Sequence, residues 1–273
     1  MEKTHPTGET YSAFAIGAQL PDRPEALLHF FDSIDSTNTY LKQTPDLAHG
    51  TVAVADRQSG GRGRRGREFE SAGGKGIYLS ILWRPRGAVE SLLSLTALGA
   101  VAACNAVEQV CGVRPGIKWT NDLVLQGKKI CGILTEMTTG SNGSIDRIVM
   151  GIGLNVCQTA EDFSPQVAEL ASSLSLLLGS PVSRTRLAAA LIRELDRLFE
   201  SLNGCSEAYL SAYRRDCITL GQPVRLLWKE GQQEALALDV DEQFGLLVQY
   251  ADGTQEVIRS GEVSVRGLYG YTT

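Results

Sequence analysis

The segment TVAVADRQSGGRGRRGREFESAGGKGIYLSILW occupies residues 51–83 and sets the architecture expected for the chain. Residues 51–55 are a short run of β-branched residues and alanine, and residues 76–83 are an apolar run that follows a Gly-Gly break. Both runs predict strands. The residues between them, 56–75, form what we call the arginine loop. A loop this long inside a compact domain is usually functional or disordered, so we expect the chemistry of the protein here.

The arginine loop is strongly basic. Five of the eleven residues from 57 to 67 are arginine and none is acidic, in a chain whose formal net charge is −5 and would be −10 without them. These five are Arg57, Arg62, Arg64, Arg65 and Arg67. One small cationic site on an acidic body suits an anionic small molecule, or one docking segment, better than a long polyanion.

Residues 61–66 spell GRGRRG, the G-x-G-x-x-G string of dinucleotide folds and kinase glycine loops. The next residues, REFESAGG, have no helical period, and the kinase strings H-R-D and D-F-G do not occur. Both assignments therefore fail. What is left is an anion clamp, in which guanidinium groups converge on phosphate or carboxylate oxygens. We hypothesise that the loop is mobile when empty and folds over its ligand. Taken alone, this segment fits a solvated basic loop or a nucleic-acid arm equally well.

On either side of this segment, short apolar runs alternate with turns. Helices are expected from near Thr39 and over residues 92–110, 184–201 and 206–217. Short strands are expected at residues 27–31, 117–119, 123–125, 129–135 and 147–156, and again at 224–228, 235–240, 245–250, 255–258 and 262–266. The pattern predicts a mixed sheet with hairpins and a small closing barrel.

The composition is that of an ordinary globular protein, with 273 residues of which 43% are apolar and 21% charged. The six cysteines never fall at a C-x-x-C spacing, so neither a structural zinc site nor a secreted disulfide scaffold is expected. A reducing, cytoplasmic location fits best. Residues 1–17 lack a signal-peptide pattern, and the apolar stretch at 92–107 is too short and too polar to cross a bilayer. No membrane association is expected.

Other candidate residues are individually weak. Lys118 and Trp119 end an apolar run, where a lysine is usually a solvated strand-end residue. The glycines within residues 132–136 and 151–155 more often mark bulges or close packing than ligand approach. The three histidines are scattered through the sequence, so no metal site or catalytic triad is expected.

The order of five motifs is more informative than any one of them. In chain order they are DSTN (35–38), ADRQSGGRGRRGR (55–67), KWTND (118–122), KICGILTE (129–136) and GIGLN (151–155). This series closely resembles the biotin protein ligase family. The resemblance implies an α+β fold, in which a mixed sheet flanked by helices, similar to class II synthetases, forms a catalytic domain. That domain would span residues 27–217, after an N-terminal extension (1–26) and before an SH3-like barrel (218–273).

Enzymes of this family join biotin to ATP as biotinyl-5′-adenylate, release pyrophosphate, and pass the biotinyl group to a lysine of a biotin carboxyl-carrier domain. The resemblance therefore implies biotin, ATP and Mg²⁺ as substrates and cofactor, and a carrier domain as partner. Because a carboxylate attacks an α-phosphate, the site must neutralise charge and needs no enzyme nucleophile.

The same resemblance implies roles for individual residues. Arg64 and Lys118 would be catalytic. Biotin would be bound by Ser36, Thr37, Asn38, Gln58, Arg62, Gly63, Arg64, Lys118 and Gly132. The nucleotide would be bound by Arg64, Arg65, Arg67, Phe69, Asn121 and Asn155. Hydroxyl and amide side chains suit the donors and acceptors of a ureido ring. Phe69 stands where the family commonly has tryptophan, so it would stack on adenine with less area. No protein ligand for a metal is implied.

Two alternatives stay open at this point. Lipoate or octanoyl transfer on the same scaffold would require an apolar tunnel in place of Ser36, Thr37 and Gln58. A non-catalytic nucleic-acid-binding regulator would use the arginine loop and show salt-sensitive DNA binding. Family members that repress transcription carry a helix-turn-helix domain, for which the roughly thirty residues before Ile34 leave no room, so we expect a monofunctional enzyme without DNA binding. A homodimer is compatible with the sequence.

Overall fold

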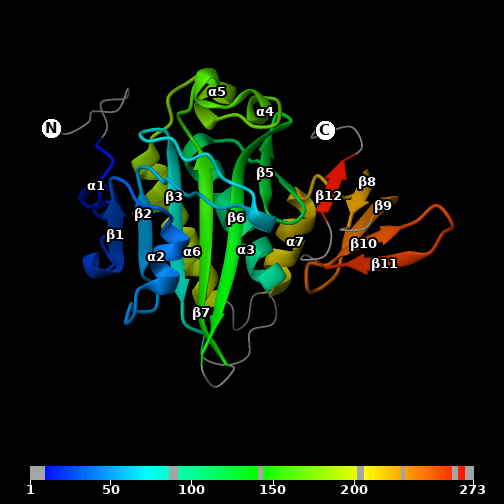
Figure 1. Ribbon diagram of the computed structural model, residues 1–273, viewed down its shortest axis with the longest axis horizontal. Coiled ribbons are helices and arrows are strands. Elements are labelled where there is room, and N and C mark those ends of the chain that lie inside the picture. The colour runs from blue at the N-terminus through cyan, green and yellow to red at the C-terminus, as the bar shows by residue number, and fades with distance from the viewer. Residues whose placement is uncertain are drawn as a thin grey trace.

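Seven strands form one mixed sheet in the larger part of the molecule (Figure 1). The computed structural model describes residues 10–85, 92–140, 144–201, 206–228, 231–259 and 264–267. The strands are β1 (Leu28–Phe31), β2 (Val52–Ala55), β3 (Gly76–Trp83), β4 (Gly116–Lys118), β5 (Asp122–Leu125), β6 (Lys128–Thr139) and β7 (Ile145–Asn155). Their order across the sheet is β1-β2-β3-β7-β6-β5-β4. The pair β1 and β2 is parallel and the other neighbours are antiparallel, which confirms the mixed sheet with hairpins.

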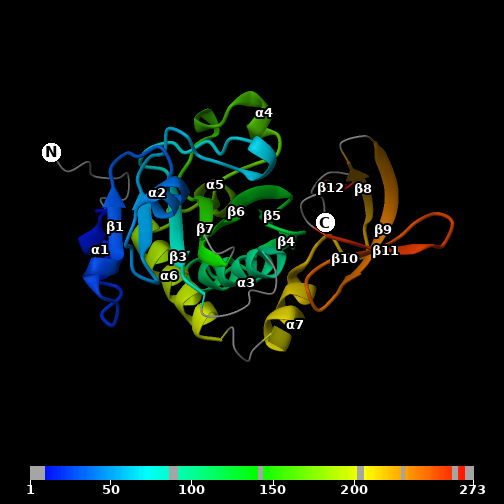
Figure 2. The ribbon, with the colours of Figure 1, turned by 60° about the horizontal axis from the view of Figure 1, so that its bottom comes forward.

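Helices cover both faces of this sheet. They are α1 (Ala13–Gly17), α2 (Thr37–Gln43), α3 (Leu92–Cys111), α4 (Pro165–Ala168), α5 (Leu174–Leu178), α6 (Arg184–Ser201) and α7 (Ser206–Asp216). Short 3-10 turns occur at η1 (Glu25–Leu27), η2 (Arg64–Gly66) and η3 (Ala160–Asp162). Figure 2 shows α3 and α6 on one face and α2 on the other. Helix α2 begins earlier than predicted because Ser36 caps it, its hydroxyl accepting the amide hydrogen of Thr39 at 3.4 Å.

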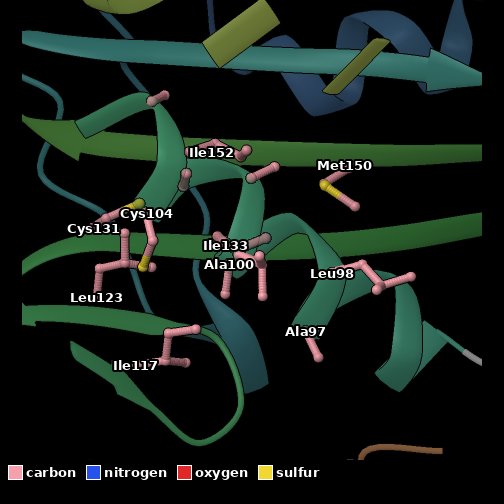
Figure 3. Close-up of a cluster of buried hydrophobic side chains, with 14 of the residues drawn as sticks. Ala97, Leu98, Ala100, Cys104, Ile117, Leu123, Cys131, Ile133, Met150 and Ile152 are labelled. Atoms are coloured by element: carbon pink, nitrogen blue, oxygen red, sulfur yellow. The ribbon is translucent and has the colours of Figure 1, made fainter. Parts of the chain in front are cut away.

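The main core lies between the sheet and α3 (Figure 3). Alternate residues of the central strands, such as Ile133 and Ile152, point toward the helix, where the small side chains of Ala100 and Cys104 allow close packing. Within the described residues, α3 is the one helix long and apolar enough to cross a membrane, and 78% of that window is buried in this core. Because α3 is packed between the sheet and α6, its residues are mostly apolar.

The first described residues, which fall in the expected N-terminal extension (1–26), pack onto the larger unit. Ser12 caps α1 by accepting the amide hydrogen of Ala15 at 3.2 Å, and Ile16 and Leu20 are buried in the main core. Helix α1 packs against α6 and β1. The sequence analysis missed this helix because a single turn with two apolar anchors is too short to show a helical period. Residues 1–9 lie outside the described part of the chain.

Five antiparallel strands form a second, smaller sheet. They are β8 (Pro223–Leu227), β9 (Gln232–Val240), β10 (Leu246–Gln249), β11 (Gln255–Ile258) and β12 (Ser264–Gly267), in the order β11-β10-β9-β8-β12. The expected small β-unit after the helical region is therefore present, and together with the mixed sheet it confirms the α+β fold class. Of the last predicted strand, residues 262–263 lie outside the described residues.

The smaller sheet is attached to the end of β4 through Trp119. The indole Nε1 of Trp119 donates to the carbonyl oxygen of Phe244 at 2.9 Å, and the ring of Phe244 packs edge-on against Tyr213 at 5.2 Å between centroids. The amide of Ile218 also donates to the carbonyl of Ile117 at 3.0 Å. These contacts fix the smaller unit beside the strand that carries Lys118.

Candidate active site

The strand register places two rows of residues on the sheet face opposite α3. One row crosses five strands and is called the lysine row: Tyr78 of β3, Gly153 of β7, Gly132 of β6, Asp122 of β5 and Lys118 of β4 are successive partners. The second, called the serine row, pairs Ser80, Gly151 and Leu134. Because alternate residues of a strand share a face, the rows lie two residues, or about 7 Å, apart.

A cavity of about 600 Å³ lies over these rows. Helix α2, the arginine loop and the sheet supply most of its lining, and Figure 1 shows the arginine loop crossing the front of the sheet. Twelve of the predicted site residues line it: Ser36, Thr37, Asn38, Gln58, Arg62, Gly63, Arg64, Arg67, Phe69, Lys118, Asn121 and Gly132. These residues come from four of the five motifs and from Phe69, and Gly151 and Gly153 of the fifth motif also line the cavity.

The cavity end above the serine row is neutral and hydrogen-bonded. We call Thr37, Asn38, Gln58 and Ser80 the polar wall. The hydroxyl of Ser80 donates to Oδ1 of Asn38 at 2.6 Å, and Thr37 Oγ1 lies 2.7 Å from Ser80 Oγ. Gln58 Oε1 accepts the amide hydrogen of Thr37 at 2.9 Å. Ser80 is fully buried, and the sequence analysis did not select it because a serine inside an apolar strand carries no motif.

Gly151 makes room for this wall. A Cβ atom on Gly151 would lie 2.1 Å from Oδ1 of Asn38, a distance no side chain tolerates. The glycine is therefore a close-packing residue, and what packs against it is a side chain of the polar wall.

The arginine loop folds back on itself and onto the sheet. The amide of Gly63 donates to the carbonyl of Arg67 at 2.7 Å, and the amide of Phe69 donates to that of Gly61 at 2.9 Å. Nη1 of Arg64 donates to Oδ1 of Asn121 at 2.9 Å, which draws this guanidinium down to the turn between β4 and β5. Arg62 instead points toward the polar-wall end, with its side chain 53% exposed.

Phe69 lies over the glycines of the lysine row. A Cβ on Gly153 would come within 2.7 Å of the Phe69 ring, and one on Gly132 would be 3.5 Å from it. The two glycines thus form a shallow recess that holds the ring above the sheet. Tyr78 packs against it edge-on, at 6.4 Å between centroids. Burial raises the pKa of Tyr78, whose hydroxyl donates to the carbonyl of Ala72 at 2.9 Å.

Two charged residues in the cavity were missed as site residues from sequence. Lys129 and Asp122 form an ion pair at 2.6 Å and both line the cavity beside Lys118. Lys129 stood in a quoted motif. On β6 it pairs with Val124 beyond a register shift, and its Nζ would lie 3.2 Å from a Cβ on Gly132, a proximity that the motif alone does not show. The lysine row therefore ends in two ammonium groups and one carboxylate.

The base of the arginine loop is held by a buried arginine. Arg184, at the start of α6, donates to Oδ1 of Asp56 at 2.8 Å and to the carbonyl of Gly76 at 2.8 Å. Asp56 also accepts the amide hydrogen of Gly74 at 3.0 Å, so the two ends of the loop share one anchor. The guanidinium lies 3.8 Å from the ring centroid of Tyr11. No sequence motif marked Arg184.

Two predicted nucleotide-binding residues differ from the rest. Asn155 is buried and does not line the cavity; its Oδ1 accepts a hydrogen bond from Gln158 Nε2 at 3.0 Å. The structure therefore gives Asn155 a role in packing at the end of β7. The side chain of Arg65 lies outside the described residues. Conversely, Arg225, Leu227 and Gln232 of the smaller sheet line the cavity although none was selected from sequence.

The arrangement defines a class of site. The polar wall forms a recess for a neutral head group, and beside it the charged end of the lysine row forms a cationic trough for phosphate or carboxylate. Residues 30–155 match the model of the Biotin/lipoate A/B protein ligase family, and residues 219–266 match that of the Biotin protein ligase C terminal domain.

Individual relatives narrow this class. The Bifunctional ligase/repressor BirA of Bacillus spizizenii is 33% identical over 251 residues, covering 84% of this chain and 71% of the relative. The Biotin--[acetyl-CoA-carboxylase] ligase of Mycobacterium tuberculosis is 32% identical over 219 residues, 78% of each chain. The Aquifex aeolicus biotin protein ligase solved with biotin and ATP superposes with a TM-score of 0.78 at 30% identity, over 88% of this chain and 98% of that one. The chain belongs to the biotin protein ligase family.

Proposed function

We propose that this protein activates biotin with ATP as biotinyl-5′-adenylate and transfers the biotinyl group to one lysine of a biotin carboxyl-carrier domain. The observation that carries the proposal is the division of the cavity into a neutral polar wall and a cationic trough about 7 Å apart along the strands. Biotin has the matching form, with a ureido ring at one end and a carboxylate at the end of its chain. Membership in the family supports the same activity.

In the first step, a biotin carboxylate oxygen attacks the α-phosphorus of ATP and pyrophosphate leaves. Both reactants are anions, so the barrier falls when fixed cations lie beside the phosphate oxygens. Lys118 at the end of the lysine row, Lys129 beside it and Arg64 of the arginine loop all line the cavity and would supply that charge. Phe69 offers an apolar ring to adenine beside them.

In the second step, the neutral amine of the acceptor lysine attacks the carbonyl carbon of the mixed anhydride and AMP leaves with the bonding electrons. The amine's extra proton is passed to solvent. Until that amine arrives, the anhydride must be kept from water. The arginine loop covers the cavity over the lysine row and is suited to this protection.

Mg²⁺ would enter with ATP. Within the described ranges no group of three or more His, Cys, Asp or Glu side chains is placed to hold a metal. The cavity contains the carboxyl groups of Glu68 and Asp122. This donor set fits an ion carried mainly by the nucleotide phosphates, which Mg²⁺ commonly binds together with one or two carboxylates. When bound, the ion would neutralise part of the phosphate charge.

The alternatives are less well supported. Lipoate or octanoyl transfer would require an apolar tunnel where the polar wall stands, and a nucleic-acid-binding regulator would have no need of that wall. The relatives described above are biotin ligases, and one of them also carries the name of a repressor.

The test is direct. We expect the protein, incubated with biotin, ATP, Mg²⁺ and a carrier domain, to release pyrophosphate only when biotin is present and to add one biotinyl mass to the carrier. A carrier whose acceptor lysine is replaced by arginine should stay unmodified. Absence of both adenylate and conjugate would contradict the proposed function.

A further inference from the structure

Glu136 stands on β6 behind the polar wall. Its Oε1 accepts a hydrogen bond from Lys42 Nζ at 2.6 Å, and its Oε2 accepts one from Asn38 Nδ2 at 2.8 Å. The nearest guanidinium nitrogen of Arg62 lies 3.9 Å away. Asn38 is among the described residues that line the cavity and Glu136 is not, so any effect of Glu136 on a ligand must pass through a neighbour.

The contacts of Asn38 fix the orientation of its amide. Its Nδ2 faces the carboxylate of Glu136 and the carbonyl oxygen of Leu134, the latter at 3.3 Å. Carboxylate and carbonyl oxygens can only accept hydrogen bonds, so the NH₂ group must point toward them. Oδ1 of Asn38 therefore faces Ser80 and must accept the Ser80 hydroxyl hydrogen at 2.6 Å.

Gln58 is fixed in the same way at the other end of the wall. Its Nε2 donates to Ser71 Oγ at 3.2 Å, while the Ser71 hydroxyl gives its own hydrogen to the carbonyl of Phe69 at 2.9 Å. Oε1 of Gln58 therefore faces Thr37, whose amide donates to it at 2.9 Å. The polar wall thus ends in an acceptor oxygen on each side.

Between the acceptor oxygens of Asn38 and Gln58 there are fewer hydroxyl hydrogens than short contacts that need one. Thr37 and Ser80 carry one hydroxyl hydrogen each, yet three short contacts require one: Ser80 to Asn38, Thr37 to Ser80 at 2.7 Å, and Thr37 to Gln58 at 3.0 Å. Once Ser80 donates to Asn38, Thr37 can supply only one of the other two. The wall therefore offers unfilled lone pairs to a ligand and favours one that brings N–H groups.

Glu136 prevents the donors and acceptors of the polar wall from exchanging places. Burial alone would raise the pKa of Glu136, but hydrogen bonds from Lys42 and Asn38 outweigh it and hold the pKa below its usual range. The group therefore remains a carboxylate, which cannot donate. Without it, the amide of Asn38 could turn, present its NH₂ to Ser80, and reverse the donors and acceptors of the wall.

We propose that Glu136 is a positioning residue for biotin, which fixes the amide of Asn38 and thereby makes the polar wall an acceptor surface for the two ureido N–H groups. The inference rests on the proposed function, because it concerns the same head-group site.

The test measures biotin affinity by calorimetry without ATP, which isolates the head-group end of the cavity. We expect Glu136→Ala to weaken biotin binding about tenfold, the loss typical of a charge-assisted hydrogen bond whose partner is left misoriented. Lys42→Ala, with all variants measured at pH 8 so that Glu136 stays ionised, is the matched control: it breaks the same ion pair but leaves the carboxylate against Asn38, and it should bind biotin as the wild type does. Equal losses in both variants would show that the ion pair matters and would overturn the proposal.

An Asn38→Ala background distinguishes an effect of Glu136 that acts through Asn38 from one that acts through Arg62. If Glu136 acts through Asn38, then adding Glu136→Ala to Asn38→Ala should cause no further loss of biotin affinity. A loss that persists in the Asn38→Ala background would mean that Glu136 acts through Arg62, against the proposal. Glu136→Gln keeps the side-chain volume, and because Lys42 can only donate, the new NH₂ is directed at Asn38. It should show the same loss if Glu136→Ala fails to fold.

The same binding experiments distinguish a failure of the proposed role of Glu136 from a failure of the proposed function. A wild-type protein that binds neither biotin nor its adenylate would contradict the function. A wild-type protein that binds biotin, with Glu136→Ala and Glu136→Gln binding equally well, would contradict only the role of Glu136.

Discussion

The polar wall and the arginine loop face the same cavity but are built differently. The wall comes mainly from α2 and β3, with Gln58 added from the start of the arginine loop; Ser80 is fully buried, Asn38 is only 5% exposed, and the side chains are bonded to one another. The loop has many exposed residues between 57 and 70 and contacts the sheet through a few side chains such as Arg64. The contrast leads us to expect that fixed parts of the fold recognise the head group, whereas the arginine loop moves to bring part of the neutralising charge.

The largest effect is expected at Lys118, which belongs to the fixed sheet yet acts with the charges of the loop. Lys118→Ala should lower the rate of biotin-dependent pyrophosphate release several hundredfold, as loss of a preorganised charge at a reacting phosphate does. Biotin affinity without ATP should fall far less than the rate. Lys128→Ala, on β6, which like β4 pairs with β5, is the control: Lys128 is bonded to the carbonyls of Ala168 and Glu169, and the variant should keep the wild-type rate. A fall in biotin affinity equal to the fall in rate would erase the distinction between the two regions.

The next effect concerns the fixed wall. Gly151→Ala would place a methyl group 2.1 Å from Oδ1 of Asn38 and so displace this amide from its bonds to Ser80 and Glu136. We expect about a hundredfold loss of biotin affinity, since displacements of an ångström in a binding constellation have effects of that size. Gly17→Ala, where a Cβ meets nothing within 4 Å, should bind biotin normally. Wild-type affinity in Gly151→Ala would show that the wall is adaptable.

A smaller effect is expected in the loop, where two arginines can be compared. Arg64 lines the cavity and bonds to Asn121, whereas Arg57 is exposed and does not line it. Arg64→Ala should speed dissociation of biotinyl-adenylate about thirtyfold, in the range of a hydrogen bond to a charged group. Arg57→Ala should leave it unchanged. Neither variant should shift the free energy of unfolding by more than about 0.5 kcal/mol. A matching loss of stability in Arg64→Ala would make the loop a structural element.

The smallest effect is expected at Phe69. Phe69→Ala should raise the KM for ATP about tenfold, because stacking of a base on an aromatic ring contributes roughly 1–3 kcal/mol. Phe69→Trp restores the family's usual residue and should lower the KM below that of the wild type. If both variants have the wild-type KM, the ring serves only to fill the recess over Gly153.

The strands, the larger helices and the two-unit organisation could be predicted from the sequence because apolar runs and turn residues mark them locally. Helix α1 could not, since one turn has no period to read. Many cavity residues within the motifs were predicted, but Asp122 and Lys129, although inside motifs, and Ser80, outside them, were missed as site residues. Their positions in the site depend on which strand lies beside which, and that register is a property of the whole sheet.

Contacts between residues far apart in the sequence limited the rest of the prediction in the same way. Nothing in the sequence near Arg184 indicates that this residue, at the start of α6, anchors Asp56 of the arginine loop. Asn155 shows the opposite case, because its motif predicted nucleotide contact while the structure turns its side chain toward Gln158.

Hydrogen exchange of the backbone amides, followed by mass spectrometry, tests the contrast between fixed wall and movable loop most directly. Without ligand, amides of α2 and β3 should exchange slowly and those of residues 57–73 rapidly. On saturation with biotinyl-adenylate, the loop amides should slow at least tenfold while the wall changes little. A loop already as protected as the wall in the free protein, or protection gained chiefly by the wall, would contradict the account.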